Sequence, residues 1–201
     1  MDKFVTITRA TAEATKSSPG PAKSSQTHRV LEFFTDGAAS RNGKAGAAGG
    51  IGVFFGDGSP LNISEPLPAS VTATNNVAEL TAAVRGLDAV RLSVLPRLEP
   101  RARVSVVMLT DSMYAINCVT KWLPAWERNG WKTKTGAPVA NRRLLERLAR
   151  LRTLLGASFV HVRAHGREPR DKASREHFLW YGNMRADQLA TAALPRARAR
   201  A

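Results

Sequence analysis

The sequence predicts an α/β fold, with a five-stranded mixed sheet flanked by helices. The first observation is the order of segments: three β-prone runs come first, and helical and β-prone runs alternate after them. The second is size, since 201 residues with 43% hydrophobic residues bury one core and are too few for two comfortable ones. The third is that two of the apolar runs end at an aspartate. Together they indicate one domain over residues 30–194.

The first three strands are expected at residues 30–36, 50–55 and 61–66. The first is rich in apolar residues such as Leu31 and Phe33 and ends at Asp36. The sequence Gly56-Asp57-Gly58 forms a turn between the second and third strands. The chain therefore opens with an antiparallel meander.

After Asn75 the pattern changes to helical spacing. Apolar residues at helical intervals predict a helix over 75–92, with Val77, Leu80, Val84 and Leu87 on one side. A strand follows at 104–110 and ends at Asp111, then a helix to about Trp122, an irregular basic segment and a helix over 141–155. The last strand is expected at 157–162 and the last helix at 184–193. Strands separated by helices are normally parallel, which makes the sheet mixed.

The two ends of the chain differ from the middle. Residues 1–29 are rich in Ser, Thr, Lys and Ala, which predicts a disordered basic leader, with a weak organellar transit peptide as an alternative. Residues 195–201 alternate Arg and Ala after a proline, which is typical of a flexible basic tail. No apolar stretch approaches the roughly 20 residues of a membrane span, so we expect no membrane association.

Charge and cysteine content bound the partner and the compartment. The formal net charge is +14, which favours a polyanionic partner such as nucleic acid. Cys118 is the single cysteine, which excludes an intramolecular disulfide and a Cys-rich zinc site, and we expect it to be a small core residue. This suits a reducing compartment, so we expect an intracellular protein of the nucleus or the mitochondrion that is not secreted.

Residues 112–155 form a basic segment with interleaved tryptophans. It carries nine Lys and Arg against two acids, together with Trp122, Trp126 and Trp131. Charge runs are more often solvated faces, but the tryptophans favour a handle that grips a nucleic-acid backbone, with some of them serving the core.

Four acidic residues are candidates for a metal site. Asp36 and Asp111 both end strands, and parallel neighbours would bring them to the same sheet edge. Glu79 near the start of the first helix and Asp187 in the last helix can complete the cluster. Like charges repel unless a cation compensates them, and oxygen ligands without Cys or His favour Mg²⁺ or Mn²⁺. Taken singly, such residues are more often helix N-terminal acids (Glu79, Asp187) or turn and N-cap residues (Asp36, Asp111), and only their conjunction favours a metal site.

Around these acids the sequence resembles the type 1 ribonuclease H family, in the catalytic domain of its cellular members. The similarity spans about residues 30–194. A fifth segment, residues 119–133, resembles the basic protrusion of that family. Each motif is weak alone, but five in the right order are specific. The four segments around the acids are Phe34-Thr35-Asp36-Gly37, Thr74-Asn75-Asn76-Val77-Ala78-Glu79-Leu80, Thr110-Asp111-Ser112, and Gly182-Asn183 through Ala186-Asp187.

The resemblance implies a ribonuclease H-like fold and an endoribonuclease that hydrolyses the RNA strand of RNA·DNA hybrids. The catalytic metal ligands would be Asp36, Glu79, Asp111 and Asp187, which would hold two Mg²⁺ ions, with Mn²⁺ as the alternative. Two-metal phosphodiester cleavage would leave 5′-phosphate and 3′-hydroxyl ends. His165 falls where the family has a histidine that assists proton transfer or product departure, although a lone histidine there is often a polar loop residue.

The resemblance also implies the substrate contacts. Asn42, Asn75 and Asn76 would contact the RNA strand in the minor groove, although Asn75 is also a candidate helix N-cap. Thr74 and Asn141 would form a pocket for a DNA phosphate, and Tyr114 and Trp122 would face DNA sugars. The expected partner is an RNA·DNA hybrid bound by a monomer, with no small-molecule cofactor.

One segment departs from the family pattern. The fifteen residues 167–181, between His165-Gly166 and Gly182-Asn183, replace the few residues usual there, and they carry four basic residues. We expect this insertion beside the site, as a candidate to grip substrate or to gate access.

Two rival functions remain. A binding module that lost catalysis is disfavoured because all four carboxylates are present. A proofreading exonuclease or junction resolvase is disfavoured by the basic, Trp-rich protrusion.

Overall fold

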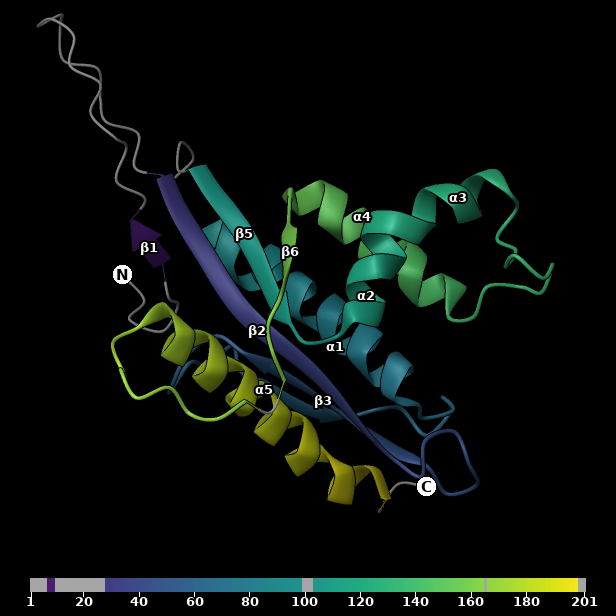
Figure 1. Cartoon of the computed structure of the whole chain (residues 1–201), viewed down its shortest axis with the longest axis horizontal. Coiled ribbons are helices and arrows are strands. Elements are labelled where there is room, and N and C mark those ends of the chain that lie inside the picture. The colour runs from purple at the N-terminus through teal and green to yellow at the C-terminus, as the bar shows by residue number, and fades with distance from the viewer. Residues whose placement is uncertain (1–6, 10–27, 99–102, 165, 199–201) are drawn as a thin grey trace, which may run out of the picture.

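A computed structural model of the chain describes residues 7–9, 28–98, 103–164 and 166–198. The sheet contains the five predicted strands in the order β4-β3-β2-β5-β6, and a short strand β1 pairs with β2 (Figure 1). Pairs β2/β3 and β3/β4 are antiparallel, whereas β2/β5 and β5/β6 are parallel, so the predicted mixed sheet is confirmed. The bounds are β1 (Ile7–Arg9), β2 (His28–Ser40), β3 (Ala48–Phe54), β4 (Ile63–Pro66), β5 (Arg103–Thr110) and β6 (Ser158–His161).

Part of the expected disordered leader is a strand. β1 pairs antiparallel with β2 from Ile7 opposite Leu31 to Arg9 opposite Arg29. This position is open because β2 is 13 residues long, and β3 pairs only with its second half, from Phe34 to Ser40. His28 and Arg29 of the expected leader begin β2, and the rest of it lies outside the described residues.

Helices cover both faces of the sheet, with α5 (Arg175–Arg198) on one face and α1 (Asn75–Ala89) on the other (Figure 1). α1 continues through η1 (Val90–Val94) and η2 (Leu95–Arg97), and α4 (Arg142–Leu155) packs beside it. The segment after Ser112 forms α2 (Met113–Asn117), η3 (Cys118–Trp122) and α3 (Leu123–Arg128). It is therefore helical beyond Trp122, where an irregular segment was expected. No described helix is both long and apolar enough to cross a membrane.

Alternation along the strands divides the core between the two faces. Phe33 and its neighbours pack against α1 and α4, whereas Phe34 packs against α5. Successive strand residues point to opposite faces, so one apolar run such as 31–34 supplies both halves of the core. Cys118 is fully buried in the first half, as expected.

Glycines in β3 let α5 lie directly on the sheet. A Cβ at Gly52 would fall 2.0 Å from the backbone oxygen of Ala186, and one at Gly50 would fall 2.2 Å from that of Ala190. Any larger residue would therefore push α5 away. The close approach determines how near the residues of α5 come to the strand edge.

The last helix is longer than predicted. It begins at Arg175 instead of residue 184, because Ser174 supplies the first-turn contacts: its Oγ accepts from the His177 backbone N–H at 3.1 Å. Phe178 and Tyr181 of the added turns pack on Phe34 and Phe54. It also continues through Pro195 to Arg198, so the described part of the expected flexible tail is helical.

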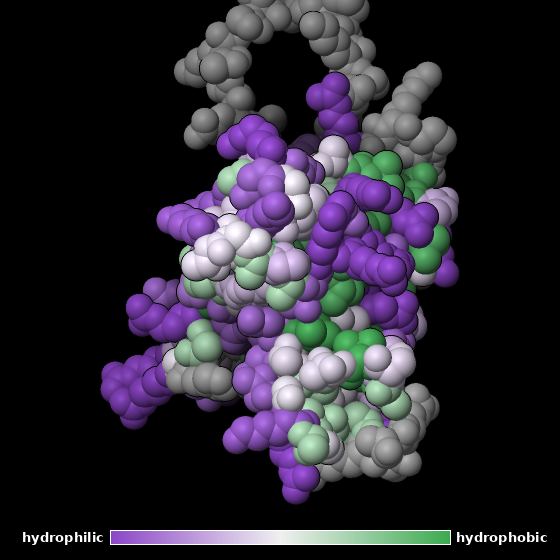
Figure 2. Space-filling view, turned by 90° about the vertical axis from the view of Figure 1, so that its right-hand side faces the viewer, coloured by the Kyte–Doolittle hydropathy of each residue, from purple (hydrophilic) through white to green (hydrophobic). Residues whose placement is uncertain are grey.

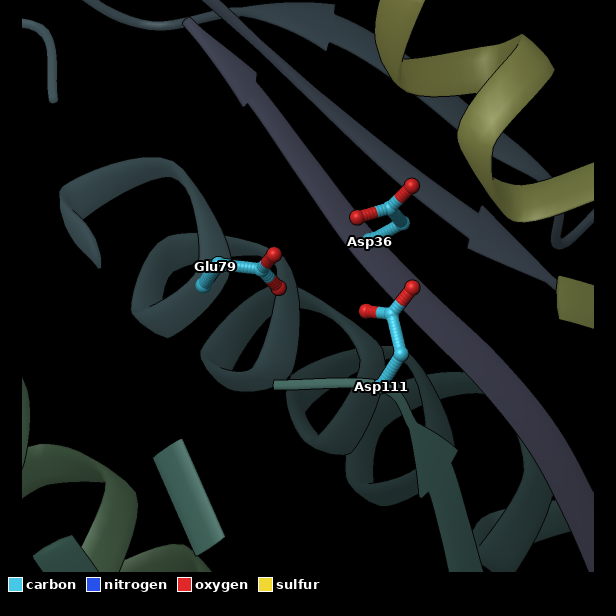
Figure 3. Close-up of side chains that lie close together, drawn as sticks. All are labelled: Asp36, Glu79 and Asp111. Atoms are coloured by element: carbon cyan, nitrogen blue, oxygen red, sulfur yellow. The ribbon is translucent and has the colours of Figure 1, made fainter. Parts of the chain in front are cut away.

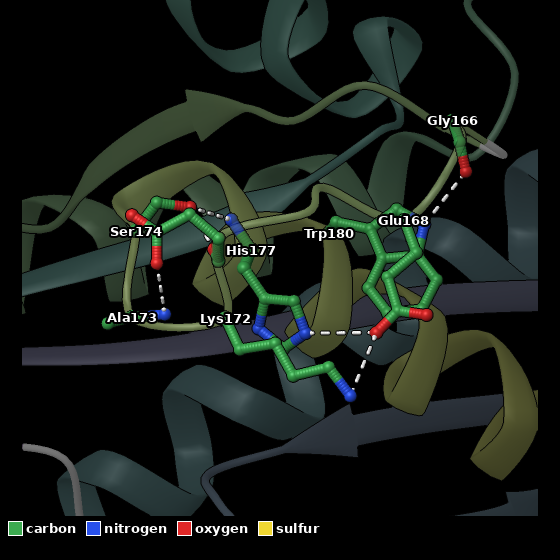
Figure 4. Close-up of polar contacts among 8 residues, drawn as sticks. Gly166, Glu168, Lys172, Ala173, Ser174, His177 and Trp180 are labelled. Carbon is green, nitrogen blue, oxygen red and sulfur yellow. Dashed lines mark hydrogen bonds and ion pairs between the residues drawn. The ribbon is translucent and has the colours of Figure 1, made fainter.

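Most of the 167–181 insertion is held against α5 itself (Figure 4). The indole Nε1 of Trp180 donates to the Gly166 carbonyl at 2.8 Å. The Glu168 carboxylate lies 3.3 Å from the His177 ring and 3.8 Å from Lys172 Nζ. The segment therefore folds back on the helix that it precedes, and its second half is the first turns of that helix.

Candidate active site

Three carboxylates from separate elements converge at one end of the sheet. Asp36 on β2, Glu79 on α1 and Asp111 after β5 each offer an oxygen, and these three atoms lie within 4.8 Å of one another (Figure 3). Asp36 is 8% exposed. Three of the four acids of the predicted metal site therefore lie close together.

The two aspartates meet where β2 and β5 separate. The last parallel pair is Phe34 opposite Leu109, and each aspartate lies two residues beyond it. The expectation that Asp36 ends its strand is wrong, because β2 continues to Ser40 paired with β3. The relevant boundary is the end of the pairing with β5, not the end of the strand.

Gly37 brings Glu79 to the aspartates. A Cβ at Gly37 would lie 2.2 Å from the backbone nitrogen of Glu79, so the first turn of α1 rests on the backbone of β2. The Gly37 N–H also donates to Asp36 Oδ1 at 2.7 Å. Glycine here permits a contact that no other residue allows, and the Phe-Thr-Asp-Gly sequence has a direct structural role.

Burial and mutual repulsion disfavour ionisation of this cluster. Desolvation and the charge of Asp111 raise the pKa of Asp36 to about 7, although the Gly37 N–H opposes this. Desolvation, with the charges of Asp36 and Asp111, raises the pKa of Glu79 to about 10. A bound cation would reverse both effects because it stabilises the charged form.

The donor set fits a hard divalent cation. Three carboxylates offer oxygen ligands alone. Glu79 Oε2 is buried and has no hydrogen-bond partner in the part of the chain that the structure describes. Buried acceptors are normally satisfied, so this oxygen is available to a metal ion.

Asp187 lies at the border of the cluster. Among the described residues, the close group contains the other three acids and not Asp187. Its charge nevertheless contributes to the raised pKa of Asp36. Asp187 is partly exposed on α5. Its role as a fourth ligand stays a prediction.

Sequence reasoning missed one residue of the site. Asn183, also on α5, is 4% exposed, and its Nδ2 donates to Asp111 Oδ2 at 3.0 Å. The available signal was its position four residues before Asp187, which places both on one side of the helix.

Most of the predicted substrate contacts line a single cleft. Its volume is about 610 Å³, and it lies at the N-terminus of α1. Trp122 is the one predicted contact that does not line it. The predicted contacts that line it are Asn42, Thr74, Asn75, Asn76, Tyr114 and Asn141.

Hydrogen bonds give the cleft its shape. Thr74 is the N-cap of α1, with Oγ1 accepting from the Val77 N–H, so the cap role considered for Asn75 is wrong. Asn75 instead accepts from Ala39 N–H through Oδ1, and its own N–H donates to Asn42 Oδ1 at 3.0 Å. These bonds tie the loop after β2 to the start of α1.

The basic, Trp-rich segment is partly core and partly surface. Trp131 is 8% exposed and Trp126 packs against the core, whereas Trp122 is 40% exposed. The Trp122 ring lies 6.3 Å from that of Tyr114, which lines the cleft. Figure 2, seen from the side of α3 and α4, shows a mostly hydrophilic surface with a few hydrophobic patches.

His165 lies outside the described residues. Gly166 and Glu168 contact Trp180 and His177 of α5, and the grip or gate by the insertion stays a prediction. The insertion extends α5 and packs it on the first half of β2, where Arg175 Nη1 donates to the buried Glu32 at 2.7 Å.

Comparisons with known proteins agree on one family. The family model of RNase H matches residues 28–195. Ribonuclease H1 of Homo sapiens is 35% identical over 166 residues, which cover 79% of this chain and 54% of the human protein. Ribonuclease H of Maricaulis maris is 34% identical over 171 residues, which cover 85% of this chain and 97% of that protein. The chain spans about half the length of the mammalian relatives it matches.

Solved structures share the fold. LC9-RNase H1, a type 1 RNase H with the type 2 active-site motif, has a TM-score of 0.60 at 22% identity, covering 84% of this chain and 73% of its own. A foamy viral protease-reverse transcriptase in complex with an RNA/DNA hybrid has a TM-score of 0.54 at 21% identity, covering 92% of this chain and 22% of its own. At these identities the likeness concerns the fold alone.

Proposed function

The chain belongs to the ribonuclease H family, and we propose that it is an endoribonuclease that hydrolyses the RNA strand of RNA·DNA hybrids. The observation that carries this proposal is the convergence of Asp36, Glu79 and Asp111 within 4.8 Å, together with a cleft at the N-terminus of α1, the helix that carries Glu79. A binding module without catalysis has no need for three buried or half-buried acids that repel one another.

The metal ligands we propose are these three acids, with Asp187 as the fourth. Two Mg²⁺ ions, or Mn²⁺ in their place, would supply the charge that activates the attacking water and stabilises the departing 3′ oxygen. Products would carry 5′-phosphate and 3′-hydroxyl ends. The protein's own part is to hold the acids together before the cation arrives, through the Gly37 contact and the separation of β2 from β5.

The cleft is where we propose that the hybrid binds. The amides of Asn42, Asn75 and Asn76 can donate to and accept from RNA 2′-hydroxyls, which distinguish RNA from DNA. Thr74 is at the N-terminus of α1 and Asn141 at that of α4, and both line the cleft; helix N-termini are favourable places for a DNA phosphate. Tyr114 and the exposed Trp122 offer apolar surface to DNA sugars.

Other parts of the proposal rest on the sequence resemblance. His165 is proposed to assist proton transfer or product departure. We also propose a monomeric, intracellular protein, for which gel filtration and localisation of the tagged full chain are the direct tests.

The test is cleavage of a labelled RNA·DNA hybrid with Mg²⁺, comparing the wild type with Asp111→Asn. We expect the wild type to cut only the RNA strand, and the variant to lose at least about 100-fold in rate, because it lacks a ligand charge at the metal centre. All-DNA and all-RNA duplexes are the controls. Binding without cleavage in both Mg²⁺ and Mn²⁺ would support the binding module, and cleavage of all-DNA duplex would support another nuclease class.

A further inference from the structure

Asn183 is a buried amide with one satisfied and one unsatisfied polar group. Its Nδ2 donates to Asp111 Oδ2 at 3.0 Å. Its Oδ1 is buried and accepts no hydrogen bond from any residue that the structure describes. The whole residue is 4% exposed. Buried amide oxygens are normally paired, so this one favours a donor brought by a ligand.

The packing of α5 aims Asn183 at the carboxylates. A Cβ at Gly182 would fall 2.1 Å from the Phe34 ring, so the helix touches β2 at the residue before Asn183. Asn183 and Asp187 are one turn apart on the same side of α5, and the charge of Asp187 acts on Asp36. One face of α5 therefore acts on both aspartates. Asn183 donates a hydrogen bond to Asp111, and the charge of Asp187 raises the pKa of Asp36.

We propose that Asn183 is a positioning residue of the metal centre. Its Nδ2 holds the Asp111 carboxylate in one orientation before a cation binds, and its Oδ1 accepts a hydrogen bond from a water molecule of the bound cation. The kinetic part of this inference rests on the proposed function, whereas the metal-binding part does not.

An amide suits this position better than a charged donor. Lys or Arg would also hold Asp111, but either would neutralise the cluster and compete with the cation. Asn183 donates without adding charge, so it does not compete with a cation for the three acids. Mg²⁺ keeps several of its waters when bound to proteins, and such waters are donors that match a buried acceptor. Residues that orient metal ligands in this way typically change metal affinity or activity by about 10–100-fold.

The test compares Asn183→Leu with Asn117→Leu. Asn117 on α2 also has a buried Oδ1 without a partner among the described residues, but it makes no described contact with the acids. Both variants remove an amide whose Oδ1 has no described partner, and both keep the approximate size of the side chain. Mn²⁺ affinity is measured by calorimetry on the full chain without nucleic acid. The half-saturating Mg²⁺ concentration for hybrid cleavage and the KM for hybrid are measured in parallel.

We expect Asn183→Leu to bind Mn²⁺ about tenfold more weakly and to need about tenfold more Mg²⁺, with the KM for hybrid within about twofold of wild type. Its metal-free Tm is measured alongside, because the substitution removes the unsatisfied Oδ1 and also the donor of Asp111. Asn117→Leu should keep wild-type metal affinity. Wild-type Mn²⁺ affinity in Asn183→Leu, or an equal loss in Asn117→Leu, overturns the proposal. If Asn183→Leu does not fold, Asn183→Ala is judged by the same affinities.

The two proposals fail separately. If the wild type does not cut hybrid but Asn183→Leu loses Mn²⁺ affinity, the proposed function is wrong and the positioning role stands. If the wild type cuts hybrid and Asn183→Leu binds Mn²⁺ normally, the proposed function stands and the positioning role is wrong.

Discussion

At the scale of single residues, the site is a set of acids placed where they are hard to ionise. Asp36 and Glu79 have raised pKa values because burial removes water and neighbouring carboxylates repel them. The Gly37 N–H and the Asn183 amide are the neutral groups that donate to the aspartates. Burying these acids costs free energy, and a bound cation would offset that cost.

This predicts an unusual pH dependence for the metal-free protein. The pKa of Asp36 rises from 3.8 in the unfolded chain to about 7 in the folded one, so the folded state binds the proton more tightly. Stability is therefore full below the unfolded pKa and falls as pH rises through about 7. In EDTA, we expect the Tm of the wild type to fall between about pH 5 and about pH 8 by more than that of Asp36→Asn. Scanning calorimetry measures this.

Near pH 8, the wild type and Asp36→Asn should also differ in their free energy of unfolding. Asp36→Asn should be more stable than the wild type without metal, by about 1–3 kcal/mol, and Mg²⁺ should stabilise only the wild type strongly. If the plots of Tm against pH for the two proteins were parallel, the raised pKa of Asp36 would have no effect on stability.

At the scale of elements, two close contacts of helices with the sheet determine the site. α1 rests on β2 at Gly37, and α5 rests on β3 at Gly50 and Gly52. The first contact places Glu79 beside Asp36, and the second brings the face of α5 that carries Asn183 and Asp187 to the same strand edge. Both contacts are backbone to backbone, so a side chain of any size disrupts them.

Gly37→Ala should therefore impair both stability and activity. The added Cβ meets the Glu79 backbone nitrogen at 2.2 Å, which forces α1 outward. We expect a loss of about 1–3 kcal/mol in urea unfolding, since overpacking costs that much. Cleavage should slow by about 100-fold, because small displacements of catalytic groups have such effects.

Gly166→Ala is the control for this prediction. A Cβ at Gly166 meets nothing within 4 Å, so the variant should stay within about 0.5 kcal/mol of wild type. If Gly37→Ala unfolds and cleaves like Gly166→Ala, the close contact of α1 with β2 does not control the site.

At the scale of the whole molecule, a strongly basic protein carries a site made of acidic residues. The net charge is +14, and residues 112–155 carry nine of the basic side chains against two acids. Lys132 and Lys134 are exposed in the segment between α3 and α4. The positive net charge of the molecule thus attracts a polyanion, whereas the acids at the site attract cations.

Hybrid binding should therefore depend strongly on salt. With Asp111→Asn, which prevents cleavage, raising KCl from about 50 to about 200 mM should weaken binding by at least tenfold. Lys132→Ala with Lys134→Ala should flatten the plot of log affinity against log salt by about 1–2, since each lysine releases about one counterion. Fluorescence anisotropy gives both slopes.

Arg103→Ala is the matched control for the salt experiment. Arg103 is exposed at the amino end of β5, whereas Asp111 follows the carboxyl end of that strand. Its loss should lower net charge without changing the slope by more than a few tenths. An equal effect of Arg103→Ala would mean that binding follows total charge and not the segment between α3 and α4.

The sequence by itself determined the order of elements, the mixed sheet and the meeting of three acids. These follow from local periods, because alternation and helical spacing are properties of neighbouring residues. The positions of Asp36 and Asp111 after apolar runs predicted a common edge if their strands were parallel neighbours. The six predicted substrate contacts that line one cleft were implied by the resemblance to the ribonuclease H family. Element ends were less predictable: α5 begins at Arg175 because its added aromatic residues find partners on β2 and β3.

Only the tertiary structure decided the features that depend on distant partners. β1 forms because β3 covers only half of β2, the insertion becomes helix because Phe178 packs on Phe34, and Asn183 reaches Asp111 because glycines let α5 approach. None of these leaves a local pattern, since each depends on how much space or how many free backbone groups another element leaves. Periodicity identifies the faces of elements, whereas close packing between them determines which atoms finally touch.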